Sequence, residues 1–79
     1  MRLDKFLKVS RIIKRRTVAN EVCDARRVMI NGRDAKASSK VDVEDIIKLT
    51  IGERTTKVRV LSIDEKAGKD FAREMYELL

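Results

Sequence analysis

The apolar residues of this chain change their spacing near Arg27, and this change restricts the folds that the chain can adopt. In residues 3–9 they recur at helical spacing, whereas Val28 and Ile30 alternate with Met29. A period of about 3.6 residues is typical of a helix, and a period of two is typical of a strand. The chain is therefore predicted to begin with helices and to continue as β-structure, which is an α+β arrangement.

Two helices are predicted before this change. Residues 3–9 should form an amphipathic helix of about two turns. The second helix is expected to run from Thr17, whose hydroxyl can cap its first turn, to about Asp24. Side chains of the second helix and of the connecting segment are expected to share the core with the first helix: Val18, Ala19, Val22 and Cys23, with Ile12 and Ile13.

The pair Asn31-Gly32 is the strongest local signal for a β-hairpin in this chain. Residues 45–51 and 56–63 are rich in β-branched side chains, so we predict two antiparallel strands there. The segment 52–54, Gly-Glu-Arg, is expected to reverse the chain between them.

Helical spacing returns near the end of the chain. Phe71, Met75 and Leu78 recur at i, i+4 and i+7, which predicts a terminal amphipathic helix after Gly68. The 79 residues contain no linker or repeat, so we expect a single domain over residues 1–79, with a core motif in about 1–50 and a hairpin and C-terminal helix in 45–79. The predicted fold is α+β, with two N-terminal helices packed on a small antiparallel sheet and a C-terminal helix.

Composition argues against catalysis, a metal site or a cofactor. The chain has no His, no Trp and no Pro, so the usual acid/base groups and metal ligands are scarce. Its single cysteine, Cys23, cannot form an internal disulfide and is expected to be structural on a buried helix face. No apolar run approaches the roughly 20 residues of a membrane span. We therefore expect a non-enzymatic, cytoplasmic protein.

The charge of the chain is divided unevenly between its two halves. Residues 1–40 hold 12 Lys/Arg and 4 Asp/Glu, a net charge of +8, whereas residues 41–79 have a net charge of −2. This segregation predicts that the N-terminal half faces a polyanion, which is most simply RNA. An anionic membrane surface is the competing hypothesis, and it requires bulky apolar residues left unburied opposite the cations.

Several basic residues are candidates for binding this polyanion. Arg2, Lys5 and Lys8 are spaced to lie along one side of the first helix, either as a phosphate-binding row or as a solvated face. The run 14–16, Lys-Arg-Arg, precedes the second helix, where cations oppose the helix dipole unless an anion is bound. Asp4 either offsets Lys8 or holds a nearby arginine in a fixed orientation.

The next candidates follow the second helix. Arg26 and Arg27 either complement the helix dipole or bind RNA, and Arg33 and Lys36 come just after the turn. Asn31 is expected to serve the turn first and any RNA second. The chain has only three aromatic residues, too few to stack the bases of a single strand, so a folded RNA is the expected ligand.

Three segments together resemble the RNA-binding domain of the ribosomal protein S-four family, also called the α-L motif. They are residues 2–7 (Arg-Leu-Asp-Lys-Phe-Leu), 16–19 (Arg-Thr-Val-Ala) and 27–32 (Arg-Val-Met-Ile-Asn-Gly). The resemblance implies two helices and an adjacent β-loop that bind structured RNA. The family usually has Gly at the position of Arg26, so either Arg26 is strained or the helix ends differently. The loop 41–45 also lacks the Gly often found before its final Asp.

Within this family, residues 1–16, Asn31-Gly32 and residues 35–39 resemble the small ribosome-associated quality-control factors and the related fifteen-kilodalton heat-shock protein. The resemblance implies binding to rRNA of an obstructed large ribosomal subunit and to peptidyl-tRNA, together with the tailing factor RqcH, by a protein that is a monomer when free. The alternatives are a structural ribosomal or assembly protein, a heat-shock-type recycling factor and an accessory domain of an RNA-modifying enzyme. The expected RNA-binding residues are Arg2, Asp4, Lys5, Lys8, Lys14, Arg15, Arg16, Thr17, Arg26, Arg27, Asn31, Arg33 and Lys36.

Overall fold

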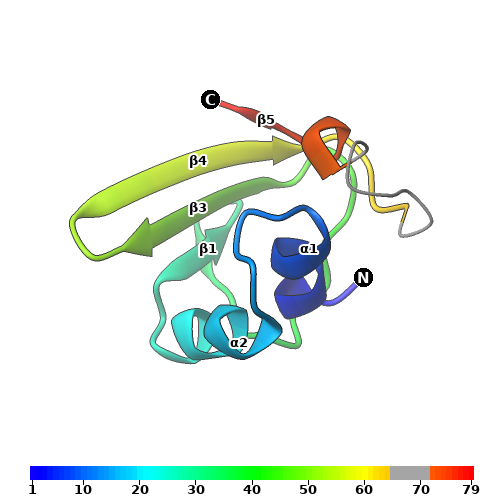
Figure 1. Cartoon of the computed structure of the whole chain (residues 1–79). Helices are drawn as coiled ribbons and strands as arrows, with labels where there is room; N and C mark the ends of the chain where they lie inside the picture. The colour runs from blue at the N-terminus through cyan, green and yellow to red at the C-terminus, as the bar shows by residue number, and fades with distance from the viewer. Residues whose placement is uncertain (65–71) are drawn as a thin grey trace.

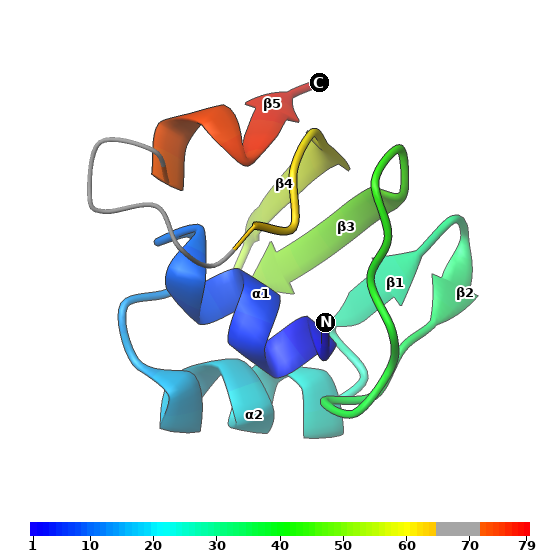
Figure 2. The same ribbon diagram turned by 90° about the vertical axis from the view of Figure 1, so that its right-hand side faces the viewer.

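Two helices cover one face of a five-stranded antiparallel sheet (Figures 1 and 2). The structure is a computed structural model, and it describes residues 1–64 and 72–79. The sheet order is β2-β1-β3-β4-β5, with antiparallel pairing between all neighbours. The expected α+β fold with two N-terminal helices on an antiparallel sheet is confirmed. The elements are α1 (Leu3–Val9), α2 (Arg16–Asp24), β1 (Val28–Ile30), β2 (Arg33–Asp34), β3 (Ile46–Ile51), β4 (Arg54–Val60), a 3-10 turn (Ala72–Glu74) and β5 (Tyr76–Leu78).

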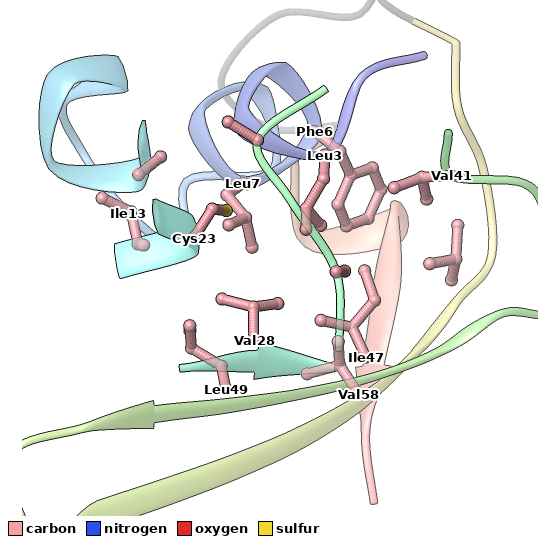
Figure 3. Close-up of a cluster of buried hydrophobic side chains, with 14 of the residues drawn as sticks. Leu3, Phe6, Leu7, Ile13, Cys23, Val28, Val41, Ile47, Leu49 and Val58 are labelled. Atoms are coloured by element: carbon pink, nitrogen blue, oxygen red, sulfur yellow. The ribbon is translucent and has the colours of Figure 1, made fainter. Parts of the chain in front are cut away.

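The core lies between α1 and the sheet, as Figure 3 shows. Leu3 and Phe6 of α1 are fully buried, and they face Ile47 of β3 and Val58 of β4. Burying one such side chain contributes about 1.5–3 kcal/mol. Because strand side chains alternate, the same strands turn their polar residues to the opposite face of the sheet.

Both hairpins have the turn chemistry that the sequence predicts. Asn31 and Gly32 join β1 to β2 with φ values of 52° and 81°, which fits a type I′ turn. The second turn consists of Gly52, at φ 60°, and the residue after it, because Arg54 already pairs with Ile51. The observed turn is thus one residue shorter than the predicted reversal over residues 52–54.

The start of α2 differs from the prediction. The helix begins at Arg16, its N-cap is Arg15, and no side chain caps it, so Thr17 lies inside the first turn. Ala19 and Cys23 are buried as expected, whereas Val18 is 38% exposed. Ala19 and Cys23 are four residues apart and so lie one above the other on the helix. The buried face of α2 is therefore narrower than the predicted stripe of four residues.

The predicted C-terminal helix is wrong over the residues that the structure describes. Met75 is buried directly after a 3-10 turn, but Tyr76 and Glu77 belong to β5, which pairs with β4 at the edge of the sheet. The N–H of Leu79 donates to the carbonyl of Lys57 at 2.9 Å, which continues this pairing. Phe71, the first residue of the predicted apolar stripe, lies outside the described residues.

Arg26 adopts a left-handed backbone conformation at the end of α2, with φ 59°. The N–H of Arg26 donates to the carbonyl of Cys23 at 3.0 Å, and that of Arg27 to Val22 at 3.2 Å. These two bonds define a Schellman motif, which usually places Gly at this position. Of the two alternatives for Arg26, the strained backbone is therefore correct. Glu44, where the family often has the other Gly, also has a positive φ, of 77°.

Candidate nucleic-acid interface

The carboxylate of Asp4 is the centre of a charged cluster between the two helices. Asp4 lies in the first turn of α1 and is only 1% exposed. The turn itself is fixed from outside the helix, because the N–H groups of Leu3 and Asp4 donate to the carbonyls of Ser39 and Ala37 at 2.7 and 3.1 Å. A carboxylate there also complements the positive end of the helix dipole.

Two guanidinium groups from different elements meet at this carboxylate. The Nε atom of Arg2 lies 3.3 Å from one oxygen of Asp4, and the Nε atom of Arg16 lies 3.5 Å from the other. Asn20 donates to Asp4 through Nδ2 at 3.2 Å, and the backbone N–H of Lys5 donates at 2.8 Å. Of the two roles considered for Asp4, the structure shows that it holds nearby arginines.

Both arginines keep a large exposed part while they contact Asp4. Their side chains are 53% exposed for Arg2 and 47% exposed for Arg16. A guanidinium group has five N–H donors in a planar fork, so contact with Asp4 leaves donors for a second anion. Orienting these groups before binding lowers the entropy cost of ordering them when an anion binds.

The connection between the helices adds further cations to this side of the protein. Lys8 is exposed in the last turn of α1, and Lys14 and Arg15 are exposed before α2. A cationic start of α2 was expected to require an external anion. The structure modifies this argument, because Asp4 supplies part of the compensation to Arg16.

Of the remaining predicted residues, Lys36 directly precedes Ala37, whose carbonyl accepts from the N–H of Asp4, and the others belong to the end of α2 and the first hairpin. Arg26 and Arg27 follow the C-terminus of α2, whereas Arg16 begins it, and a helix of nine residues is about 13 Å long. Asn31 uses its side chain within the protein, donating to Asp45 Oδ1 at 3.1 Å and accepting from the N–H of Ile46 at 2.9 Å. Arg33 in β2 and Lys36 in the loop after it are both exposed.

Asn20 is a member of the cluster that the sequence prediction omitted. It follows Arg16 by four residues, so the two side chains share one face of α2. This spacing was the available signal, but Asn20 carries no charge and lies among the residues assigned to the buried side. Its amide ties α2 to α1 through Asp4.

Cys23 has no exposed thiol for chemistry. It is 1% exposed, and burial, followed by the negative charges of Asp4 and Asp24, raises its pKa to about 11. The thiol is therefore protonated at neutral pH, and the predicted burial of Cys23 is confirmed.

The described residues include neither a helix that is long and apolar enough to cross a membrane nor a cluster of three or more potential metal ligands. The site consists instead of oriented cations on two helices.

Two helices that display cations from one side of an antiparallel sheet define a small RNA-binding domain of mixed α and β structure. The S4 domain model matches residues 1–47 of this chain. That segment contains α1, α2, the first hairpin and the Asp4 cluster.

The relatives narrow this assignment. The RQC P-site tRNA stabilizing factor of Streptococcus pneumoniae is 48% identical over 79 residues, covering 100% of this chain and 90% of the relative. The factor of the same name from Bacillus subtilis is 49% identical, with 100% and 92% covered. The chain therefore belongs to the S4 domain family and, within it, to the family of RQC P-site tRNA stabilizing factors.

A solved structure agrees with this placement. Heat Shock Protein 15 of Vibrio cholerae superposes with a TM-score of 0.88 at 29% identity, covering 100% of this chain and 81% of the other. The sequence resemblance to the small ribosome-associated quality-control factors and to their heat-shock relative is thus confirmed.

Proposed function

We propose that this protein binds the large ribosomal subunit obstructed by peptidyl-tRNA, contacts its rRNA and the tRNA, and stabilises the tRNA while RqcH elongates a C-terminal alanine tail. The observation that carries the proposal is the pair of arginines held at the buried carboxylate of Asp4. The names of the relatives support the tRNA ligand and the pathway. The work takes place where ribosomes translate, in the cytoplasm.

The contact surface follows from the arrangement of the cations. Arg2 and Arg16 present oriented forks to phosphate groups, which fix the register and orientation of an RNA without reading its sequence. The surface around them comprises Lys5, Lys8, Lys14, Arg15 and Thr17, while Arg26, Arg27, Asn31, Arg33 and Lys36 extend it past the far end of α2.

The mechanism is binding without a chemical step. A protein that contacts rRNA and tRNA together favours the arrangement in which both contacts are made. The tRNA is thereby held in one position between successive additions to the tail, and the gain equals the difference in binding free energy between the arrangements.

Co-sedimentation with purified large subunits tests this proposal. The wild-type protein should bind subunits that carry peptidyl-tRNA more tightly than empty subunits. About five phosphate contacts give a log–log salt slope near −3 to −5. The variant Arg2→Ala/Arg16→Ala should bind more weakly with a shallower slope, whereas Arg54→Ala, an exposed cation at the second hairpin, serves as the charge control.

Equal binding to all subunits at full stoichiometry would contradict the proposal and indicate a structural ribosomal protein. A flat salt response would exclude phosphate contacts as the main source of affinity.

The structural likeness to Heat Shock Protein 15 favours one second candidate, a recycling factor that acts without tail synthesis. Reconstitution with RqcH separates the two. If adding the protein leaves alanine incorporation by RqcH unchanged while it still binds obstructed subunits, the recycling role is supported and the proposed role fails.

A further inference from the structure

The face of the sheet opposite the helices carries its own group of cations. In β3 and β4, Ile47 and Val58 point to the core, so their neighbours Lys48 and Lys57 point away from the helices. Lys48 and Lys57 are exposed and directly opposite each other in the antiparallel pairing. This pair lies on the far side of the sheet from the Asp4 cluster.

Like charges directly opposite each other on neighbouring strands are unfavourable for the sheet. Within residues 1–64 and 72–79, neither Lys48 nor Lys57 forms a salt bridge. The next cation on this face, Arg59, differs because its Nη1 atom lies 2.7 Å from Oε1 of Glu77. The charges of the two lysines are therefore uncompensated, whereas the charge of the neighbouring Arg59 is compensated by Glu77.

A surface pocket of about 240 Å³ adjoins Lys48. Three cations and a hydroxyl line it, with one methionine and no acidic residue: Arg26, Arg27, Lys48, Thr50 and Met29. Its wall is fixed, because the N–H of Thr50 donates to the carbonyl of Arg27 at 2.8 Å. Arg26 reaches this pocket from a left-handed backbone that favours Gly, so an arginine stands there at a conformational cost.

We infer that Arg26, Arg27, Lys48 and Thr50 form a second phosphate-binding site for an RNA backbone, with Lys57 at its edge. Arginine, lysine and hydroxyl groups are the side chains that usually contact phosphate in nucleic acids. Met29 is the one large apolar side chain that lines the pocket, whereas membrane insertion requires several bulky apolar residues, so a membrane surface does not suit this face.

The inference rests on the proposed function in taking RNA as the ligand. It assigns Arg26 and Arg27, at the far end of the proposed surface, to a separate phosphate site that they form with Lys48 on the outer face of the sheet. Arg16 begins α2 and Arg26 follows its end, so the two sites can contact different RNA segments at once. The protein would then join two RNA segments through opposite sides.

The test uses the full chain, labelled with ¹⁵N, and a short blunt RNA duplex of mixed sequence as the probe. Amide signals of Arg27, Thr50 and Lys57 should shift in a saturable way, alongside those of residues 2–16. In Lys48→Thr the first group should need about five- to tenfold more duplex for the same shift. The log–log salt slope for that group should become shallower by about 0.9. The melting temperature should stay equal or rise, because a like-charge pair is removed.

The matched control is Arg54→Thr, which removes one exposed cation from β4 on the other face of the same hairpin. It should leave the shifts of Arg27 and Thr50 unchanged. Equal weakening by both variants would show a diffuse charge effect and overturn the inference. If residues 2–16 shift while the outer face does not, the second site fails and the proposed function stands. If neither group shifts, both fail.

Discussion

The helical face and the outer face of the sheet both gather cations, but they hold them differently. On the helical face, the buried carboxylate of Asp4 contacts Arg2 and Arg16, so the guanidinium groups are oriented and partly compensated. On the outer face, Lys48 and Lys57 oppose each other with no salt bridge to any described residue. The first arrangement provides orientation, and the second provides uncompensated charge.

The difference separates two ways of attracting RNA. An oriented pair of arginines loses net charge but needs little further ordering when it meets a phosphate. Opposed lysines attract an anion strongly but also repel each other, so they reduce the stability of the hairpin. Substitutions on the helical face should therefore couple stability to affinity, whereas those on the outer face should separate the two.

The largest effect is expected from Asp4→Asn. The substitution weakens charge-assisted hydrogen bonds from Arg2, Arg16 and Asn20, so the free energy of unfolding should fall by about 2–3 kcal/mol. Affinity for large subunits should also fall, although the net charge becomes more positive. Urea unfolding and co-sedimentation measure the two quantities. Glu53→Gln makes the same charge change at an exposed turn and should slightly strengthen binding. Tighter binding by Asp4→Asn would show that charge outweighs orientation.

The second effect is a loss of stability at high pH through Cys23. Burial and the charges of Asp4 and Asp24 raise its pKa from the ordinary value of 9.0 to about 11. The folded state thus holds the proton more tightly than the unfolded state. The stabilisation from the protonated thiol is complete below pH 9 and is lost as the pH rises towards 11. This loss reaches about 1 kcal/mol by about pH 10.

Urea unfolding across this pH range should show a smaller fall for Cys23→Ala than for the wild type. Asp4→Asn should lower the Cys23 pKa, measured from the pH dependence of thiol alkylation, because one of the charges that raises it is removed. An unchanged pKa would mean that Asp4 exerts no field on the thiol, and would weaken the comparison of the two faces.

A smaller effect is expected from the two strained positions. Arg26→Gly and Glu44→Gly each replace a residue at positive φ, so each should raise the free energy of unfolding by about 0.5–1 kcal/mol. Only Arg26→Gly should also weaken RNA binding on the outer face. Thermal melts and the duplex titration separate these outcomes, and equal loss of binding in both variants would assign it to the backbone.

The smallest effect is expected from Glu77→Gln. Its ion pair with Arg59 joins β5 to β4 at 2.7 Å, but both side chains are more than two-fifths exposed. The stability loss should be about 0.5 kcal/mol or less. The released cation should strengthen binding of the RNA duplex to the outer face, as measured in the same titration. No gain in affinity would show that Arg59 lies too far from the bound phosphates.

The helices and the first hairpin could be predicted because their signals are local. The apolar spacing of residues 3–9 and the Asn31-Gly32 pair each specify a structure within a few residues. Local signals of this kind could not predict the structure at the C-terminal end of the chain. The spacing of Met75 and Leu78 fits a helix, whereas the observed strand depends on pairing with β4, more than fifteen residues earlier in the chain.

The site was predictable in its charge but not in its organisation. Charge segregation and the run at residues 14–16 located the cations, and Asp4 was identified as a possible holder of arginines. Which side chains contact Asp4 depends on how α1 packs against α2. The sequence therefore could not show that Arg2, from the start of α1, and Asn20, from α2, contact the same carboxylate. Lys48 and Lys57 were not predicted because their proximity follows from strand register, which sequence spacing alone does not specify.

The attachment of α1 to residues 37–41 has a consequence for the order in which the protein is made. The first turn of this helix is held by Ser39 and Ala37, and Met1 accepts from the N–H of Val41. These residues therefore leave the ribosome before their partners, which follow more than thirty residues later in the chain. A nascent chain that ends before Val41 should lack an ordered Asp4 cluster. The protein should therefore bind RNA through this cluster only after residues 37–41 have emerged from the ribosome.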